Sequence, residues 1–231
     1  MSTENRPVEG RNEGCDFSVA GGIYCLIVEA LTIRQATPRD TNRIAEIISG
    51  EPGQEAIGLT GSAELARAFG MAMVRLPNSP MGWKRTVVAE TNRRVVGIVQ
   101  AGDFPDFGPT PRLMYLAIRV FGPVKLMRLT PRLRARGRVQ PKRPRGAYHI
   151  AEIDVDPSFR NQGIGSALLD HVEAEARSGG YARMSLTTTT VNPARRLYER
   201  HGFNVVETKA DAAYERYTGI GGRHLMLKEL E

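Results

Sequence analysis

The sequence predicts an α/β fold in which a mixed β-sheet is flanked by helices. Strand-like and helix-like runs alternate along the second half of the 231-residue chain. The run 147–155 alternates like a strand, and the next run places Ile164, Leu168 and Val172 four residues apart, as on one face of a helix. A content of 41% hydrophobic and 25% charged residues is ordinary for a globular domain with a buried core.

Turn and capping residues mark the elements of the first half of the chain. A strand is expected to end within 31–36, and Thr37 and Pro38 then begin a helix as its N-cap and first helical residue. A second helix is predicted over about 62–74, because its apolar residues Leu65, Phe69 and Met73 are four residues apart. Two β-branched runs on either side of 91–94 predict a hairpin.

The second half continues with a strand over about 183–190 and a short helix. Asn192 is expected to cap that helix, with Pro193 as its first helical residue. Two further strand-like runs follow. In the strand at 147–155, alternation predicts that Glu152 and His149 lie on opposite faces, so that only one of them faces a cleft.

Composition shifts suggest how the chain is organised. We expect residues 1–30 to form a partly flexible N-terminal extension and residues 31–231 to form a single domain, with an insertion at about 103–146. No Asp or Glu occurs between Phe107 and Ala151, whereas this stretch carries eleven Lys or Arg residues. The net charge of +7 therefore comes from a basic, proline-containing insertion on a mildly acidic body.

Several classes of protein are excluded by what the sequence lacks. Two cysteines form neither a disulfide framework nor a metal set, and a reduced, cytoplasmic setting is expected. No apolar run reaches the length of a membrane span, so no membrane association is expected. Four scattered histidines make a metal site or a catalytic triad improbable, and His171, His201 and His224 are interpreted as surface or packing residues.

Two glycines separated by one residue lie between the strand at 147–155 and the helix that follows. A glycine pair in this place lets several backbone N–H groups point at one spot, where the positive end of the helix dipole adds to them. Such a loop holds a phosphate, but an ordinary tight turn uses glycine too. The third glycine of a dinucleotide fingerprint is absent, since Leu168 stands there, and no Walker loop occurs.

The sequence motifs before and after the glycine pair favour the hypothesis that the loop binds a phosphate. Arg160, Gly163 and Gly165 match the loop Arg/Gln-x-x-Gly-x-Gly/Ala of the GNAT superfamily of acyl-CoA-dependent N-acyltransferases, with Gln162 replacing the usual Arg or Lys. The later stretch NPARRLYERHGF resembles the second signature of that superfamily. The strong resemblance covers about 147–207, and a weaker one covers 31–100. It implies a GNAT-like fold, whose central mixed sheet is splayed between two parallel strands.

The resemblance also implies that acetyl-CoA is bound as the acyl donor. Its pyrophosphate would rest on the backbone amides from Gln162 to Ser166, and its pantetheine arm would pair like a strand with Ile153 and Val155. Asn192 and Arg195 would lie along that arm. The residues expected to bind the donor are Ile153, Val155, Arg160, Asn161, Gln162, Gly163, Ile164, Gly165, Ser166, Asn192 and Arg195.

Amide formation needs a base for the ammonium proton, a donor to the oxyanion and an acid for the leaving thiolate. By resemblance, Tyr198 is the acid and the backbone N–H near Val155 is the oxyanion donor. Glu152 is the favoured base, because a partly buried carboxylate has a raised pKa. His149 and a chain of water molecules remain alternatives.

The expected reaction is direct attack by a primary amine, of a small molecule or a protein, on acetyl-CoA in a ternary complex. The alternative function is a non-catalytic acyl-CoA-binding or nucleic-acid-associated module with the same fold. The basic insertion indicates an anionic acceptor or partner, although a solvated loop would have the same composition. Homodimer formation is left open.

Overall fold

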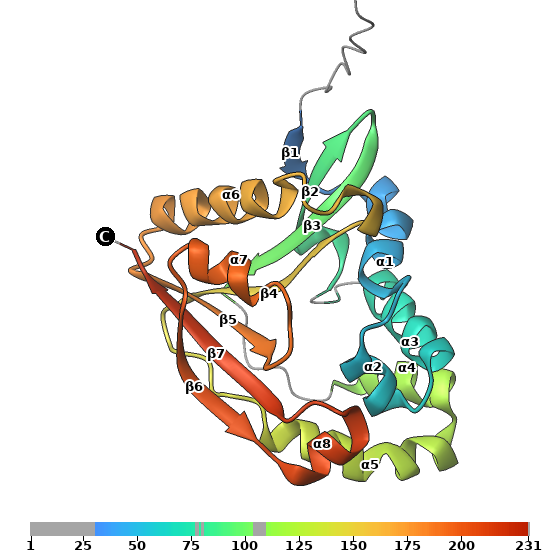
Figure 1. Ribbon diagram of the computed structural model, residues 1–231. Helices are drawn as coiled ribbons and strands as arrows, with labels where there is room; N and C mark the ends of the chain where they lie inside the picture. The colour runs from blue at the N-terminus through green and yellow to red at the C-terminus, as the bar shows by residue number, and fades with distance from the viewer. Residues whose placement is uncertain (1–30, 77–78, 80, 104–109, 231) are drawn as a thin grey trace, which may run out of the picture.

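The computed structural model describes residues 31–76, 79, 81–103 and 110–230, which include the whole expected domain except short gaps and the last residue. Among them seven strands form one sheet in the order β1-β2-β3-β4-β5-β7-β6 (Figure 1). The strands are β1 (Thr32–Gln35), β2 (Thr86–Thr91), β3 (Arg94–Gly102), β4 (Tyr148–Val155), β5 (Arg183–Thr189), β6 (Asn204–Ala210) and β7 (Gly222–Glu229). The helices are α1 (Thr41–Ser49), α2 (Gln54–Thr60), α3 (Ala63–Arg75), α4 (Pro111–Phe121), α5 (Pro123–Arg138), α6 (Ile164–Ser178), α7 (Arg195–Arg200) and α8 (Ala212–Thr218).

Strands β4 and β5 are parallel, whereas the other neighbouring strands of the sheet are antiparallel. Their pairing covers only Tyr148–Ile150 against Met184–Leu186. Both strands continue beyond this segment, β4 to Val155 and β5 to Thr189, without pairing to each other. The sheet therefore opens between β4 and β5, which confirms the expected splayed mixed sheet.

Helices cover both faces of the sheet. In β2, Val87 and Ala89 belong to an apolar core with Leu168 and Val172 of α6, whereas Val88 belongs to a second core with Ile44 of α1. Because successive side chains of a strand point to opposite faces, α6 and α1 lie on opposite sides of the sheet. The sheet is thus the middle layer, with helices on both sides of it.

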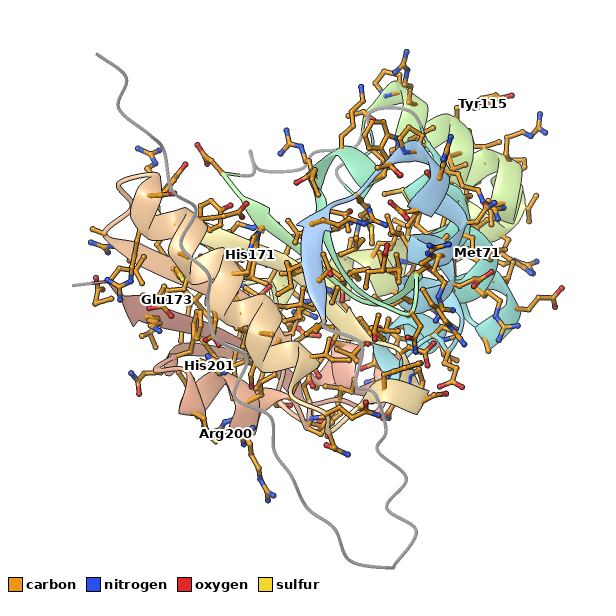
Figure 2. The ribbon with its side chains drawn as sticks, turned by 90° about the horizontal axis from the view of Figure 1, so that it is seen from above. Met71, Tyr115, His171, Glu173, Arg200 and His201 are labelled. Carbon is orange, nitrogen blue, oxygen red and sulfur yellow. The ribbon has the colours of Figure 1, made fainter. Side chains whose placement is uncertain are left out.

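The insertion forms the two helices α4 and α5, with Pro111 and Pro123 near their starts, where proline is compatible with a helix. Phe121 of α4 packs on Phe69 of α3, with ring centroids 5.1 Å apart. Helix α5 contacts α2 and α8, and these three helices gather beside the ends of β6 and β7 (Figure 1). Seen from above, α4 with Tyr115 lies far from α6 with His171 (Figure 2).

Some expected elements differ in their boundaries. The helix predicted from Thr37 begins with the short 3-10 turn Pro38–Asp40, and α7 begins at Arg195 and not at Pro193. Helices α2 and α8 were not predicted. The expected N-terminal extension, with both cysteines, lies outside the described residues. Within the described part, no helix is both long and apolar enough to cross a membrane.

Candidate active site

A polar cavity of about 180 Å³ lies where β4 and β5 separate. Its walls come from both strands, from α7 and the loop before it, and from α2 and β7 on the far side. The lining residues are Glu55, Ile150, Ala151, Glu152, Ile153, Leu186, Thr187, Thr188, Thr189, Asn192, Tyr198 and Arg223. The cavity therefore joins four of the predicted site residues with two charged residues that the sequence did not single out, Glu55 and Arg223. The four are Glu152, Ile153, Asn192 and Tyr198.

A β-bulge in β4 decides which side chains face this cavity. Gln100 of β3 pairs with Glu152, but the next residue, Ala101, pairs with Ile150, so that Ala151 is the extra residue on β4. As a consequence, Ile150 and Ile153 pack into the same core although they are three residues apart. The predicted strict alternation along this strand is therefore wrong, and it does not separate the faces of Glu152 and His149.

Glu152 lines the cavity as a half-buried carboxyl group. Desolvation raises its pKa to about 7, and the nearby carboxylate of Asp154 acts in the same direction. The positive charge of Arg223 opposes this rise. A carboxyl group with this pKa is partly deprotonated at neutral pH and can accept a proton there.

His149, the alternative base, does not line the cavity. It is buried in β4, and its Nδ1 lies 2.9 Å from Oγ of Ser185 on β5. Burial lowers its pKa to about 3, with a further lowering by the charges of Arg143 and Arg223. The imidazole is thus neutral and engaged in holding β4 to β5.

Tyr198 lies on α7 with 5% of its surface exposed, and it lines the cavity. Its ring packs edge-on against Phe203, with centroids 6.4 Å apart. Desolvation raises the pKa of its hydroxyl above the ordinary value, and the charges of Glu152 and Asp154 add to the shift. The hydroxyl therefore stays protonated at neutral pH, as a proton donor must.

The edge of β4 that faces the opening can be identified from one hydrogen bond. The N–H of Asp156 donates to the carbonyl of Val96 at 2.8 Å, on the β3 side. Since backbone groups alternate along a strand, the N–H groups of Val155 and Ile153 point to the other side, into the opening. These are the two residues that the resemblance assigns to the pantetheine arm.

The backbone groups of Val155 are covered by side chains. Its N–H donates to Oδ1 of Asp154 at 2.8 Å, and its carbonyl accepts from Nε of Arg160 at 3.1 Å. Arg160, expected at the pyrophosphate, is thus folded back on the end of β4, where it also lies 3.5 Å from Asp154.

The glycine loop makes a tight turn into α6. Asn161 and Gly163 have positive φ angles of 62° and 82°, and Gly163 is the N-cap of the helix. The N–H groups of Ile164, Gly165 and Ser166 in the first turn have no acceptor within the helix. Asn161 and Gln162 are exposed, so the loop presents a free, electropositive helix end to solvent.

Asn192 links the loop before α7 to β5. Its Nδ2 donates to Oγ1 of Thr188 at 2.7 Å, and its Oδ1 accepts from the N–H of Ala194 at 2.9 Å. It therefore fixes the cavity wall and does not act as the N-cap of α7. Arg195 is exposed and pairs with Glu199 at 2.7 Å, on the outer side of α7.

The remaining histidines lie outside the cavity. His201 is 3.3 Å from Asp170, and His171 is 3.6 Å from Glu175. His224 is buried, with its Nδ1 2.8 Å from the hydroxyl of Thr208. These positions agree with the interpretation as packing or surface residues. Among the described residues no group of His, Cys, Asp and Glu is arranged to hold a metal ion.

The sequence of this chain matches the profile of the Acetyltransferase (GNAT) family over residues 72–203, more than half of its length. The chain belongs to the GNAT acetyltransferase family. A Bacillus subtilis (strain 168) protein named Uncharacterized N-acetyltransferase YsnE is 37% identical over 65 residues. That match covers 27% of this chain and 43% of the relative, so it spans less than half of the relative's length.

Solved structures show the same GNAT fold. A structure titled as an acetyltransferase is 24% identical, with a TM-score of 0.52, covering 87% of this chain and 100% of its own. The PaiA N-acetyltransferase of Thermoplasma acidophilum, solved with coenzyme A, is 12% identical with a TM-score of 0.55, covering 87% and 99% of the two chains. A mosquito arylalkylamine N-acetyltransferase like 5b has 18% identity, a TM-score of 0.53 and coverage of 87% and 100%.

Proposed function

We propose that the protein is an N-acetyltransferase that transfers an acetyl group from acetyl-CoA to a primary amine by direct attack in a ternary complex. The observation that carries the proposal is the meeting of Glu152 and Tyr198, from different elements, at one cavity in the opening between β4 and β5. Family membership and the coenzyme A bound to a protein of the same fold support acetyl-CoA as the donor.

The donor would enter along the open edge of β4. The backbone amides from Gln162 to Ser166 would hold its pyrophosphate, because the first turn of α6 has unsatisfied N–H groups and a positive dipole end. Ile153 and Val155 would pair with the pantetheine arm through backbone groups that face the opening. Arg160 would have to leave the carbonyl of Val155 to reach the pyrophosphate.

The two titratable side chains would then divide the proton transfers. Glu152, with its pKa near neutral, would take the ammonium proton of the acceptor, directly or through water. The amine would attack the thioester carbonyl, and the N–H of Val155 would stabilise the oxyanion once Asp154 releases it. Tyr198 would give its proton to the departing thiolate of coenzyme A.

A thiol-release assay with acetyl-CoA and a broad panel of amines tests this function. We expect turnover with at least one amine, and about a 100-fold loss of kcat in Tyr198→Phe, because phenylalanine fills the same space without the proton. The KM for acetyl-CoA should stay within threefold of the wild-type value. Binding of coenzyme A without turnover of any amine would instead support a non-catalytic acyl-CoA module, and absence of binding would refute both functions.

The basic insertion gives a further part of the proposal. Its helices α4 and α5 carry eight of the eleven positive charges, and α5 contacts α2, which lines the cavity. We therefore expect an anionic acceptor or partner whose affinity falls with added salt. Homodimer formation is tested separately, by sedimentation at two ionic strengths.

A further inference from the structure

Arg223 at the start of β7 lies in the wall of the cavity and is itself nine-tenths buried. One terminal nitrogen donates to Glu55 at 2.5 Å, and the other donates to the carbonyl and hydroxyl oxygens of Thr187 at 3.2 and 3.3 Å. Its Nε is buried and has no hydrogen-bond partner among the described residues. A buried donor without an acceptor is costly, and a ligand oxygen would satisfy it.

The orientation of this guanidinium is fixed by Glu55 of α2. Glu55 accepts from Arg223, from Nε of Arg136 at 2.8 Å and from the hydroxyl of Tyr214 at 2.7 Å. Burial raises the pKa of Glu55, but the charges of Arg223 and Arg136 outweigh this effect and lower it, so the carboxylate is ionised. Arg136 belongs to α5, and the insertion thus takes part in building this wall.

The charges in this cluster do not balance. One carboxylate, Glu55, faces two guanidinium groups, Arg136 and Arg223, which leaves one positive charge in excess beside the cavity. A second cationic group on the acceptor would be repelled there, and a carboxylate would be attracted. On the other side of the cavity, Glu152 is the carboxyl group that is free to accept a proton from an amine.

We propose that the acceptor is a small amine that carries a carboxylate, with its amino group at Glu152 and its carboxylate on the guanidinium of Arg223. A planar guanidinium offers parallel N–H donors to the two oxygens of a carboxylate. The cavity of about 180 Å³ fits an acceptor of amino-acid size. This inference rests on the proposed N-acetyltransferase function and specifies its acceptor class.

The carboxylate takes no part in bond making. The amine nitrogen forms a bond to the thioester carbonyl carbon, and the carbon–sulfur bond of acetyl-CoA breaks. Glu152 takes the ammonium proton before the attack, and the thiolate receives a proton from Tyr198. The second nitrogen proton, which is lost as the amide forms, passes to the tyrosinate directly or through water and restores Tyr198. Arg223 holds the acceptor during these steps, and its removal should therefore affect acceptor binding more than the rate at saturation.

Matched pairs of acceptors test the proposal in the wild-type protein. Glycine, β-alanine and 4-aminobutyrate are compared with methylamine, ethylamine and propylamine, and L-leucine is compared with 3-methylbutylamine. The members of each pair differ only in the carboxylate. We expect kcat/KM to be about 10- to 100-fold higher for at least one amino acid than for its decarboxylated partner, as befits a charge-assisted hydrogen bond. Glycine, β-alanine and 4-aminobutyrate differ in the length of chain between the amine and the carboxylate. The one with the highest kcat/KM therefore indicates the spacing between Glu152 and Arg223.

Variants of the cluster separate recognition from structure. Arg223→Gln should raise KM for the amino acid about 10- to 100-fold. It should lower kcat/KM for the decarboxylated amine several-fold less than for the amino acid, because that acceptor is affected only by the higher pKa of Glu152 once the positive charge is gone. Arg223→Lys should restore part of the lost affinity. Arg138→Gln on α5 is the matched control, because Arg138 is exposed and pairs with Asp211 outside the cavity.

The results that would refute the carboxylate site differ from those that would refute the acetyltransferase function. Turnover of plain amines at the same kcat/KM as their amino acids would refute the carboxylate site and leave the acetyltransferase standing. Equal losses for both members of a pair in Arg223→Gln would show a purely structural role and would also refute it. Where Arg223→Gln does not fold, Arg136→Gln replaces it: removing the excess charge should raise KM for the amino acid alone, and an unchanged KM would count against the proposal.

Discussion

The backbone N–H of Val155 donates to the carboxylate of Asp154 at 2.8 Å, on the edge of β4 that faces the opening of the sheet. The same peptide edge is where the thioester carbonyl would find its hydrogen-bond donor. Asp154 therefore competes with the substrate for this N–H. Asp154 also lies close enough to Glu152 to raise the pKa of that residue, so one side chain influences both donor binding and the base.

Replacing this side chain should change two measurable quantities. In Asp154→Ala we expect KM for acetyl-CoA to fall about threefold, because the N–H no longer has a competing acceptor and a negative charge beside the anionic donor is removed. The acidic limb of the pH–rate profile should move to lower pH, since removal of a negative neighbour lowers the pKa of Glu152. Asp170→Ala on α6 is the control, because its side chain is 67% exposed and pairs with His201 outside the cavity. A limb that stays in place would refute the coupling of Asp154 to Glu152.

The pH dependence of the wild-type reaction follows from Glu152 itself. Its pKa of about 7 means that the base form is lost as the pH falls through neutrality. We expect kcat/KM to rise with pH up to about 7 and then to level, with the lower limb falling about tenfold per pH unit. Glu152→Gln should lower kcat about 100-fold and abolish this limb. Persistence of the limb in the glutamine variant would assign the base to another group.

The glycine loop offers a matched pair of positions at the two ends of α6. Gly163 and Gly180 have φ angles of 82° and 71°, and at both of them an added Cβ would meet no atom within 4 Å. Alanine should therefore destabilise each variant by about 1 kcal/mol through backbone strain alone. Only Gly163→Ala should also raise KM for acetyl-CoA, because Gly163 precedes the N–H groups assigned to the pyrophosphate. Denaturant unfolding and steady-state kinetics measure the two effects, and equal KM values for the two variants would count against this location of the pyrophosphate.

The residues proposed for the donor side carry signals that are local in sequence. Gly163 is the N-cap of α6 and Gly165 lies in its first turn, and Asn192 and Tyr198 stand within one short loop and helix. The sequence spacing of these residues therefore does not depend on how the rest of the chain packs. The resemblance to the GNAT family rests on the same local signals, and the family match confirms it.

The cavity wall formed by Glu55 and Arg223 could not be predicted, because its contacts are distant in sequence. Glu55 and Arg223 are 168 residues apart, and neither belongs to a recognisable motif. The bulge at Ala151 was equally hidden, since no glycine or proline marks it and it depends on how Gln100 and Ala101 pair with β4. A one-residue shift reverses the faces of a strand, and alternation alone therefore misassigned the faces of Glu152 and His149.

The position of α6 depends on the absence of a side chain at Gly97 of β3. A Cβ there would lie 2.9 Å from Cγ2 of Ile164 and 3.2 Å from Cδ1 of Leu168, both in the first half of α6. Gly97→Ala should therefore destabilise the protein by about 1–3 kcal/mol, as overpacking of a core does. It should also raise KM for acetyl-CoA, because Ile164 is the first residue of the helix that follows the glycine loop. Gly137→Ala on α5 meets no atom within 4 Å and should stabilise the protein by about 0.5 kcal/mol, with KM unchanged. Urea unfolding of both variants measures whether the free energy of unfolding falls in one and rises in the other. A Gly97→Ala protein as stable as the wild type would show that α6 adjusts freely, so that its contact with β3 does not fix the position of the glycine loop.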